Sequence, residues 1–159
     1  MKNKASFFVT AAIVFALDQL TKYLVISAMA LGETRPVIRD FFHLTYVMNK
    51  GISFGLLQDF RWVIAGLSCL AIVVMVWLIF RLEGLPFSMH VLLGLVAGGA
   101  LGNLTDRVRY GEVIDFLDFR GIWPYIFNAA DMSVVCGGIL LAVFYIGYEV
   151  INSKGREKR

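Results

Sequence analysis

The sequence has little charge for its length and few residues that form disulfides or bind metal ions. Only 17% of its 159 residues are charged, and it contains two cysteines, two histidines and three prolines. Both cysteines, Cys69 and Cys136, lie in apolar segments, which excludes the framework of a disulfide-rich domain. The net charge is +3 and no basic run lies inside the chain, so we expect no nucleic acid partner.

Apolar residues, by contrast, make up 58% of the chain. A soluble domain of this length has too little interior to hide that much apolar surface, and the surplus has to face lipid or a partner. Such a composition also excludes a disordered chain. We therefore expect a single integral membrane domain over residues 1–159.

Four apolar stretches are long enough to cross a bilayer, which takes about 20 residues in a helix. The predicted spans cover residues 5–26, 62–80, 85–105 and 127–149. A cleaved signal peptide is a poorer interpretation of the first stretch, because Asp18 interrupts its apolar core and three more spans follow. The predicted fold is a mainly α membrane protein, a bundle of four transmembrane helices.

Basic residues at the two ends of the chain predict its orientation. Lys2 and Lys4 precede the first span, and the last span is followed by Lys154, Arg156, Lys158 and Arg159. Since basic residues favour the cytoplasmic side, we expect both termini to be cytoplasmic and the loops 32–61 and 106–126 to be extracytoplasmic.

The first of these loops has the composition of a small sheet. Residues 37–54 are rich in Val, Ile, Thr, Tyr and Phe, and Asn49-Lys50-Gly51 is a turn signal. We expect short strands on the outer face of the membrane.

Glycines recur every fourth residue in the third span, at Gly94, Gly98 and Gly102. The resulting stripe lets another backbone approach closely. We expect it to pack inside the bundle rather than form a dimer face.

Polar residues inside the spans gather at one depth. Asp18 lies in the outer half of the first span, Asn103 and Asp106 end the third, and Asn128 and Asp131 begin the fourth. Ionisable groups inside a membrane are costly, so such a cluster indicates a functional site. The alternative is a structural clamp, in which neighbouring charges pair with each other, Asp18 with Lys22 and Asp106 with Arg107 or Arg109.

The sequence lacks the residues that most hydrolytic mechanisms need. The chain has no His-Glu-x-x-His and no Cys-x-x-Cys sequence, so we expect no metal. The segment 51–55 matches the Gly-x-Ser-x-Gly string of serine hydrolases, but the only later histidine, His90, lies near the inner end of its span. Cys136 also lacks a base at its depth.

Two carboxylates suffice for hydrolysis, because a close pair shares one proton and can serve as base and acid together. Asp131 is the first candidate, and its partner is Asp106, Asp115 or Asp118. Asp106 adjoins Arg107, which suits an ionised structural role, and Asp118 suits an exposed loop. Asp115 lies between apolar residues that raise the pKa of a carboxyl, so we favour Asp115.

Five segments in this order resemble bacterial lipoprotein signal peptidase, or signal peptidase II. They are Asp18-Gln19-Leu20-Thr21-Lys22, Asn49-Lys50-Gly51, the run 98–107 (Gly-Gly-Ala-Leu-Gly-Asn-Leu-Thr-Asp-Arg), Val113-Ile114-Asp115-Phe116 and Phe127-Asn128-Ala129-Ala130-Asp131. The resemblance implies an aspartic endopeptidase of the bacterial plasma membrane, with a β-cradle on its extracytoplasmic face. Its substrates would be prolipoproteins, cleaved just before a diacylglyceryl-modified cysteine.

The resemblance also implies site residues. Asp115 and Asp131 would form the catalytic dyad near the extracytoplasmic face. The residues that order the site and substrate would be Asp18, Lys22, Asn49, Gly51, Asn103, Asp106, Arg107, Asn128 and Ala130. We expect a monomer in contact with membrane lipid, without a metal or organic cofactor. The interval between Asp115 and Asp131 is short for the family, and Asp118-Phe119 echoes Asp115-Phe116, which leaves the register of this loop open.

Two other functions compete with a peptidase. A small proton- or ion-coupled membrane carrier also uses buried carboxylates, but carriers place their sites near the midplane and often contain inverted repeats. No repeat of spans is visible here. A non-catalytic membrane assembly factor would use the polar cluster only as a clamp, and only an activity measurement separates it from an enzyme.

Overall fold

The computed structural model describes residues 2–51 and 61–156 of the chain. Within these ranges, four helices and three strands follow one another as α1 (Lys2–Ala28), β1 (Thr34–Ile38), β2 (Phe42–Asn49), α2 (Arg61–Arg81), α3 (Phe87–Tyr110), β3 (Val113–Phe119) and α4 (Ala129–Arg156). All four helices are long and apolar enough to cross a membrane. The predicted four-helix bundle with a small sheet is confirmed.

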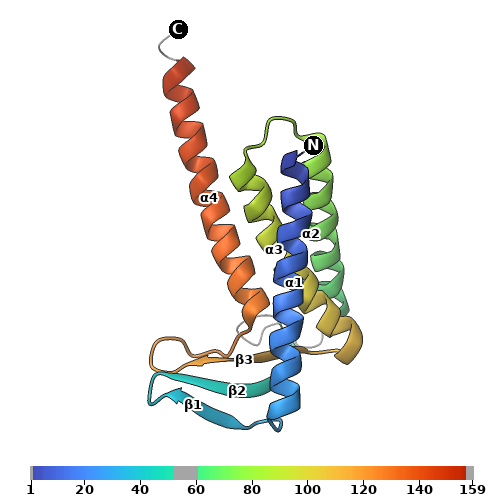
Figure 1. Ribbon diagram of the computed structural model, residues 1–159, viewed down its shortest axis with the longest axis vertical. Helices are drawn as coiled ribbons and strands as arrows, with labels where there is room; N and C mark the ends of the chain where they lie inside the picture. Colours follow the sequence, from blue (N-terminus) through green and yellow to red (C-terminus); the bar gives the residue numbers. More distant parts are fainter. Residues whose placement is uncertain (1, 52–60, 157–159) are drawn as a thin grey trace.

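Helix α3 lies at the centre of the bundle and packs against α1, α2 and α4. The three-stranded sheet lies across one end of the bundle, while the start of α1 and the end of α4 lie toward the other end (Figure 1). The two regions have separate apolar cores. Phe7, Ile79 and Leu93 join α1, α2 and α3, whereas Val25 and Ile114 join the end of α1 to the sheet.

The glycine stripe of α3 packs inside the bundle, as the sequence predicts, and the structure shows that it faces α1. A Cβ atom at Gly94 would lie 2.7 Å from the carbonyl oxygen of Phe7, and one at Gly98 would lie 2.6 Å from that of Ala11. Both separations are shorter than real Cβ contacts, so only glycine allows the two helices this approach.

Large apolar side chains cover the outward faces of the helices. On α2, Leu70 and Trp77 are 59% and 58% exposed, and on α4, Ile139 and Val143 are 59% and 63% exposed. Water would make such surfaces costly, whereas lipid tails suit them. These lipid-facing surfaces account for the apolar residues that exceed what the interior of the protein can bury.

The sheet is antiparallel, in the order β1-β2-β3. The prediction of strands within residues 37–54 is confirmed for β2, but it missed the reversal at Arg39–Phe41, where Asp40 adopts a φ of 57°. Residues 52–54 of that prediction, and the serine of the Gly-x-Ser-x-Gly string, lie outside the described residues. The third strand comes from the second loop, where no strand was predicted.

The third helix is longer than its predicted span of 85–105. It runs to Tyr110 and ends at Gly111, whose φ of 79° lets its backbone N–H bond the carbonyl oxygen of Arg107. Asp106 and Arg107 therefore belong to the last turns of α3 rather than to the loop 106–126. The chain reverses at Gly111 and enters β3, which carries Asp115 back beside the helix ends.

Candidate active site

Asp115 lies in the middle of β3 and is buried, with 1% of its surface exposed. Its two oxygens accept hydrogen bonds from two amides. Asn49 Nδ2 donates to Oδ2 at 2.8 Å, and Asn128 Nδ2 donates to Oδ1 at 2.6 Å. Asn49 ends the neighbouring strand β2 and Asn128 precedes α4, so the carboxyl is held where the sheet meets the bundle.

Asp131 lies in the first turn of α4, where it forms a reciprocal cap with Asn128. The backbone N–H of Asp131 donates to Asn128 Oδ1 at 2.9 Å, and the backbone N–H of Asn128 donates to Asp131 Oδ2 at 3.2 Å. The Asn-x-x-Asp spacing thus has the pattern of a capping box. The other oxygen, Oδ1, accepts a bond from Asn103 Nδ2 of α3 at 2.7 Å.

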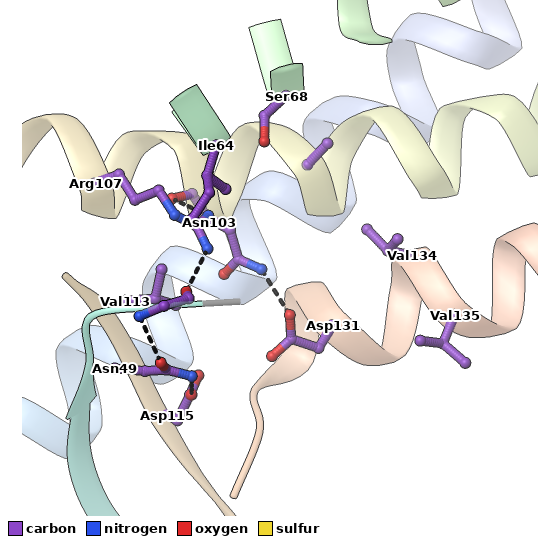
Figure 2. Close-up of a pocket in the computed structure, with 12 residues that line it drawn as sticks. Asn49, Ile64, Ser68, Asn103, Arg107, Val113, Asp115, Asp131, Val134 and Val135 are labelled. Carbon is purple, nitrogen blue, oxygen red and sulfur yellow. Dashed lines mark hydrogen bonds between the residues drawn. The ribbon is translucent and has the colours of Figure 1, made fainter. Parts of the chain in front are cut away.

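Both carboxyls line one cavity of about 220 Å³ between the sheet and α2, α3 and α4. Figure 2 shows Asp115 and Asn49 on the sheet side and Asp131 on the helix side, with Asn103 and Arg107 above them. The remaining walls are mostly apolar. They are formed by Gly51, Ile64, Ser68, Ala100, Val113, Val134 and Val135.

The pKa of Asp115 is raised from 3.8 to about 7. Burial is the largest cause, since it removes the water that would solvate the charge, and the nearby Asp131 adds repulsion. The bonds from Asn49 and Asn128 and the charge of Lys22 oppose this rise. The apolar setting predicted from the sequence therefore acts as expected, and the carboxyl can hold a proton near neutral pH.

A second pair of carboxylates lies beside the first, around Lys22. Its ammonium nitrogen is 2.8 Å from Asp18 Oδ2 and 2.7 Å from Asp106 Oδ2, and all three side chains are buried. Gln19 Nε2 donates to the same two carboxylates, at 3.2 Å and 3.1 Å. The predicted pair of Asp18 and Lys22 is present, but Asp106 pairs with Lys22 and not with a neighbouring arginine.

Arg107 joins the end of α3 to the segment that follows β2. Its Nη2 donates to the carbonyl oxygen of Gly51 at 3.1 Å, and its Nη1 donates to the carbonyl oxygen of Asn103 at 3.3 Å. The backbone N–H of Gly51 in turn donates to Asn49 Oδ1 at 3.0 Å, in an Asx turn. These bonds hold Asn49, which binds Asp115, at the edge of the cavity.

Asp118 lies apart from the cavity. It accepts a bond from Thr45 Oγ1 at 2.8 Å and pairs with Arg120 at 3.1 Å. The expectation of an exposed loop carboxylate was wrong, because Asp118 lies in β3 and only 13% of its side chain is exposed. The register of this segment is therefore settled in favour of Asp115 as the residue that faces Asp131 across the cavity.

The structure brings all the sequence-predicted site residues together at one end of the bundle. Ala130 contributes its backbone N–H, which donates to Asp18 Oδ1 at 3.0 Å. Sequence reasoning missed Gln19, although it lies next to Asp18, and missed Ile64 and Ser68, because no local pattern places α2 at the cavity. Among the described residues, no group of three or more His, Cys, Asp or Glu side chains is placed to hold a metal ion.

Comparison with known proteins identifies the family. A family model described as signal peptidase (SPase) II matches residues 10–147. A lipoprotein signal peptidase of Desulfitobacterium hafniense is 42% identical over 139 residues, which cover 87% of this chain and 91% of that protein. A lipoprotein signal peptidase of Pelotomaculum thermopropionicum is 46% identical over 151 residues, which cover 95% and 98%.

Solved structures agree with this comparison. A bacterial membrane enzyme determined at 2.3 Å superposes with a TM-score of 0.84 at 30% identity and covers 93% of this chain and 91% of its own. A second, determined at 1.9 Å, gives a TM-score of 0.79 at 31% identity, with 89% and 92% covered. Family, fold and membrane-spanning helices agree, and this bacterial membrane protein belongs to the signal peptidase II family of aspartic proteases.

Proposed function

We propose that this signal peptidase cleaves prolipoproteins with Asp115 and Asp131 as its two catalytic carboxyls. This assignment rests on the cavity that the two carboxyls share and on the uncharged hydrogen-bond donors that hold both of them. In the part of the chain that the structure describes, every hydrogen bond to them comes from an amide, of Asn49, Asn103 or Asn128 or of the backbone. Within the described residues, neither carboxylate forms an ion pair with a Lys or Arg.

The surroundings of the two carboxyls give them different roles. Asp115 holds a proton near neutral pH, because its pKa is about 7. Asp131 lies at the N-terminus of α4, where the helix dipole favours a negative charge. We assign Asp131 as the general base and Asp115 as the general acid.

The reaction then follows the order of an aspartic peptidase. Asp131 removes a proton from a water molecule, whose oxygen attacks the scissile carbonyl carbon while Asp115 donates its proton to the carbonyl oxygen. As the tetrahedral intermediate collapses, the hydroxyl returns its proton to Asp115, the proton on Asp131 passes to the amide nitrogen, and the C–N bond breaks. The products are a new carboxyl group and a new amine, and the dyad again holds one proton.

The position of the cavity suits a lipid-anchored substrate. It lies where the sheet meets the ends of the spans, and apolar residues of α2 and α4, among them Ile64 and Val134, line it (Figure 2). An apolar signal segment would stay in the membrane, while a diacylglyceryl-modified cysteine would lie at the interface beside the dyad. Because one chain supplies both carboxyls and the amides that hold them, we propose a monomer that acts as a single membrane domain over residues 1–159.

This account requires the sheet end of the bundle to be extracytoplasmic and both termini to be cytoplasmic. Cysteine labelling can test that orientation in intact spheroplasts, on a background in which Cys69 and Cys136 are replaced by Ser. A membrane-impermeant maleimide should label Asp40→Cys, at the exposed tip between β1 and β2, but not Glu83→Cys, between α2 and α3. Labelling only at residue 83 would reverse the orientation and remove the geometric argument for the substrate.

Activity measurements test the dyad. Asp115→Asn and Asp131→Asn preserve the size of each side chain but remove the shared proton, so cleavage of a diacylglyceryl prolipoprotein should fall by several powers of ten. Asp118→Asn is the matched control, because it changes the other carboxylate of β3 outside the cavity, and it should cleave at nearly the normal rate. The variants should be compared as purified proteins at equal folded concentration. Normal cleavage by a folded Asp115→Asn or Asp131→Asn protein would show that the assignment is wrong.

A further inference from the structure

The three N–H donors of Lys22 bind three acceptors that lie next to the dyad. Its nitrogen is 2.8 Å from Asp18, 2.7 Å from Asp106 and 3.0 Å from Asn103 Oδ1, and only 2% of its side chain is exposed. An ammonium group has three hydrogens, so this environment uses each of them once. None of the three acceptors is itself a member of the dyad.

Each carboxylate bound by Lys22 holds the backbone just before one catalytic residue. Asp18 Oδ1 accepts the N–H of Ala130, which precedes Asp131, at 3.0 Å. Asp106 Oδ2 accepts the N–H of Ile114, which precedes Asp115, at 3.3 Å. The two bonds fix the start of α4 and the first residues of β3 to one cation on α1.

The third acceptor connects Lys22 to the carboxyls themselves. Asn103 donates through Nδ2 to Asp131 at 2.7 Å, while its Oδ1 accepts bonds from both Lys22 and Asn128 Nδ2, the latter at 3.1 Å. Asn128 Nδ2 is the group that donates to Asp115 at 2.6 Å. Because its oxygen is engaged by Lys22 and Asn128, the amide of Asn103 has to present its NH₂ group to Asp131.

We propose that Lys22 is a positioning residue that sets the separation and orientation of Asp115 and Asp131. This inference rests on the proposed function, because it treats those two residues as the dyad. The dyad residues come from a strand and a helix. The residues just before α4 bond directly to β3, and Lys22 adds a second connection by binding both elements through Asp18 and Asp106. Small displacements of reacting groups cost large factors in rate, so a group that fixes their geometry acts on kcat.

A clamp that only stabilises the fold would behave differently. It would change the amount of folded protein, but each folded molecule would keep its kcat and its pH profile. The positioning role adds an electrostatic effect, since the charge of Lys22 opposes the rise in the pKa of Asp115. Of the residues whose side chains are described, the other charged groups that face this site are Asp131 on α4 and Arg107 on α3, and both are retained in the Lys22 variants.

The test compares Lys22→Met with Lys4→Met in detergent-solubilised enzyme, per folded molecule, with a fluorogenic diacylglyceryl-Cys peptide as substrate. Lys4 lies on the same helix at the opposite end, where it contacts Phe80, so its replacement removes the same charge away from the site. For Lys22→Met we expect kcat to fall about 100-fold with KM unchanged, and the pH profile to move to higher pH. Lys4→Met should have the same kcat, KM and pH profile as the unmodified enzyme.

Lys22→Arg covers the case in which Lys22→Met does not fold. It keeps the charge that Asp18 and Asp106 require, but a planar guanidinium cannot place one nitrogen against three acceptors. We expect a lowered kcat with an unchanged pH profile. Unchanged kcat in folded Lys22→Arg, or in folded Lys22→Met, overturns the inference. If Asp115→Asn and Asp131→Asn are inactive in the same assay, that result leaves the dyad intact and rejects only the role of Lys22.

Discussion

Two pairs of carboxylates lie at the same end of this bundle, and their partners differ. Asp18 and Asp106 are fully buried and share the ammonium group of Lys22. Asp115 and Asp131 line the cavity and, among the residues described, accept hydrogen bonds only from amides. The positive charge of Lys22 offsets the negative charge of the first pair. The amides orient the second pair but bring no positive charge to it.

The difference shows how the chain separates structure from chemistry. A buried carboxylate next to a cation belongs to an ion pair, and removing one partner leaves a buried charge with less compensation. A carboxyl that receives only neutral hydrogen bonds can gain and lose a proton at moderate cost, as the pKa of about 7 for Asp115 shows. This contrast supports the proposal that the second pair carries out the chemistry.

The two pairs should differ most in how much stability is lost when one carboxylate is replaced. Asp106→Asn keeps an oxygen for the N–H of Ile114 but removes one of the two carboxylates that pair with Lys22. Breaking a buried ion pair costs about 3 kcal/mol or more, so the melting temperature and the yield should both fall. Activity per folded molecule should fall far less than in Asp115→Asn.

The matched control for this measurement is Glu112→Gln. Glu112 pairs with Lys50 at 3.8 Å near the surface, where loss of an ion pair costs at most about 1 kcal/mol. Equal losses of stability in the two variants would contradict the distinction between the two pairs, as would a folded Asp106→Asn protein that is as inactive as Asp115→Asn.

A smaller effect concerns the pH dependence of stability. The pKa of Asp115 is about 7 in the fold against 3.8 ordinarily, so the folded state binds this proton more tightly than the unfolded state. The resulting stabilisation is complete below pH 3.8 and is lost as the pH rises through about 7. Its upper limit is about 4 kcal/mol, and Asp115→Asn lacks it.

Melting temperatures at a series of pH values measure this contribution. The stability of Asp115→Asn relative to the unmodified protein should rise between pH 4 and pH 8, because only the unmodified protein has to ionise the carboxyl of Asp115. Parallel curves over this range would mean that Asp115 ionises freely and is not the acid of the dyad.

Much of the bundle could be predicted from the sequence, because each span needs a continuous apolar run and lipid supplies the same environment along all of it. The reciprocal cap of Asn128 and Asp131 was not predicted, although the two residues have the spacing of a capping box. Strand β3 was not predicted either, since Val113–Phe119 is a short run interrupted by two aspartates and owes its strand character to pairing with β2.

The partners of the carboxylates were harder to predict than their depth. The spacing of Asp18 and Lys22 on one helix face predicted their ion pair, but the bond from Lys22 to Asp106 joins α1 to α3 and has no local signal. A neighbouring arginine was the nearest cation in sequence to Asp106. The structure instead turns Arg107 toward the carbonyl oxygen of Gly51.

The central claim is that Asp115 and Asp131 act as one unit, and a double-mutant cycle tests it most directly. The measurement is kcat/KM for prolipoprotein cleavage by Asp115→Asn, Asp131→Asn and the double variant, at matched folded concentration. Once either carboxyl is lost the shared proton is gone, so the double variant should be about as inactive as either single variant. Losses that multiply, so that the double variant is slower by the product of the two single effects, would show that the carboxyls act independently and would contradict this account.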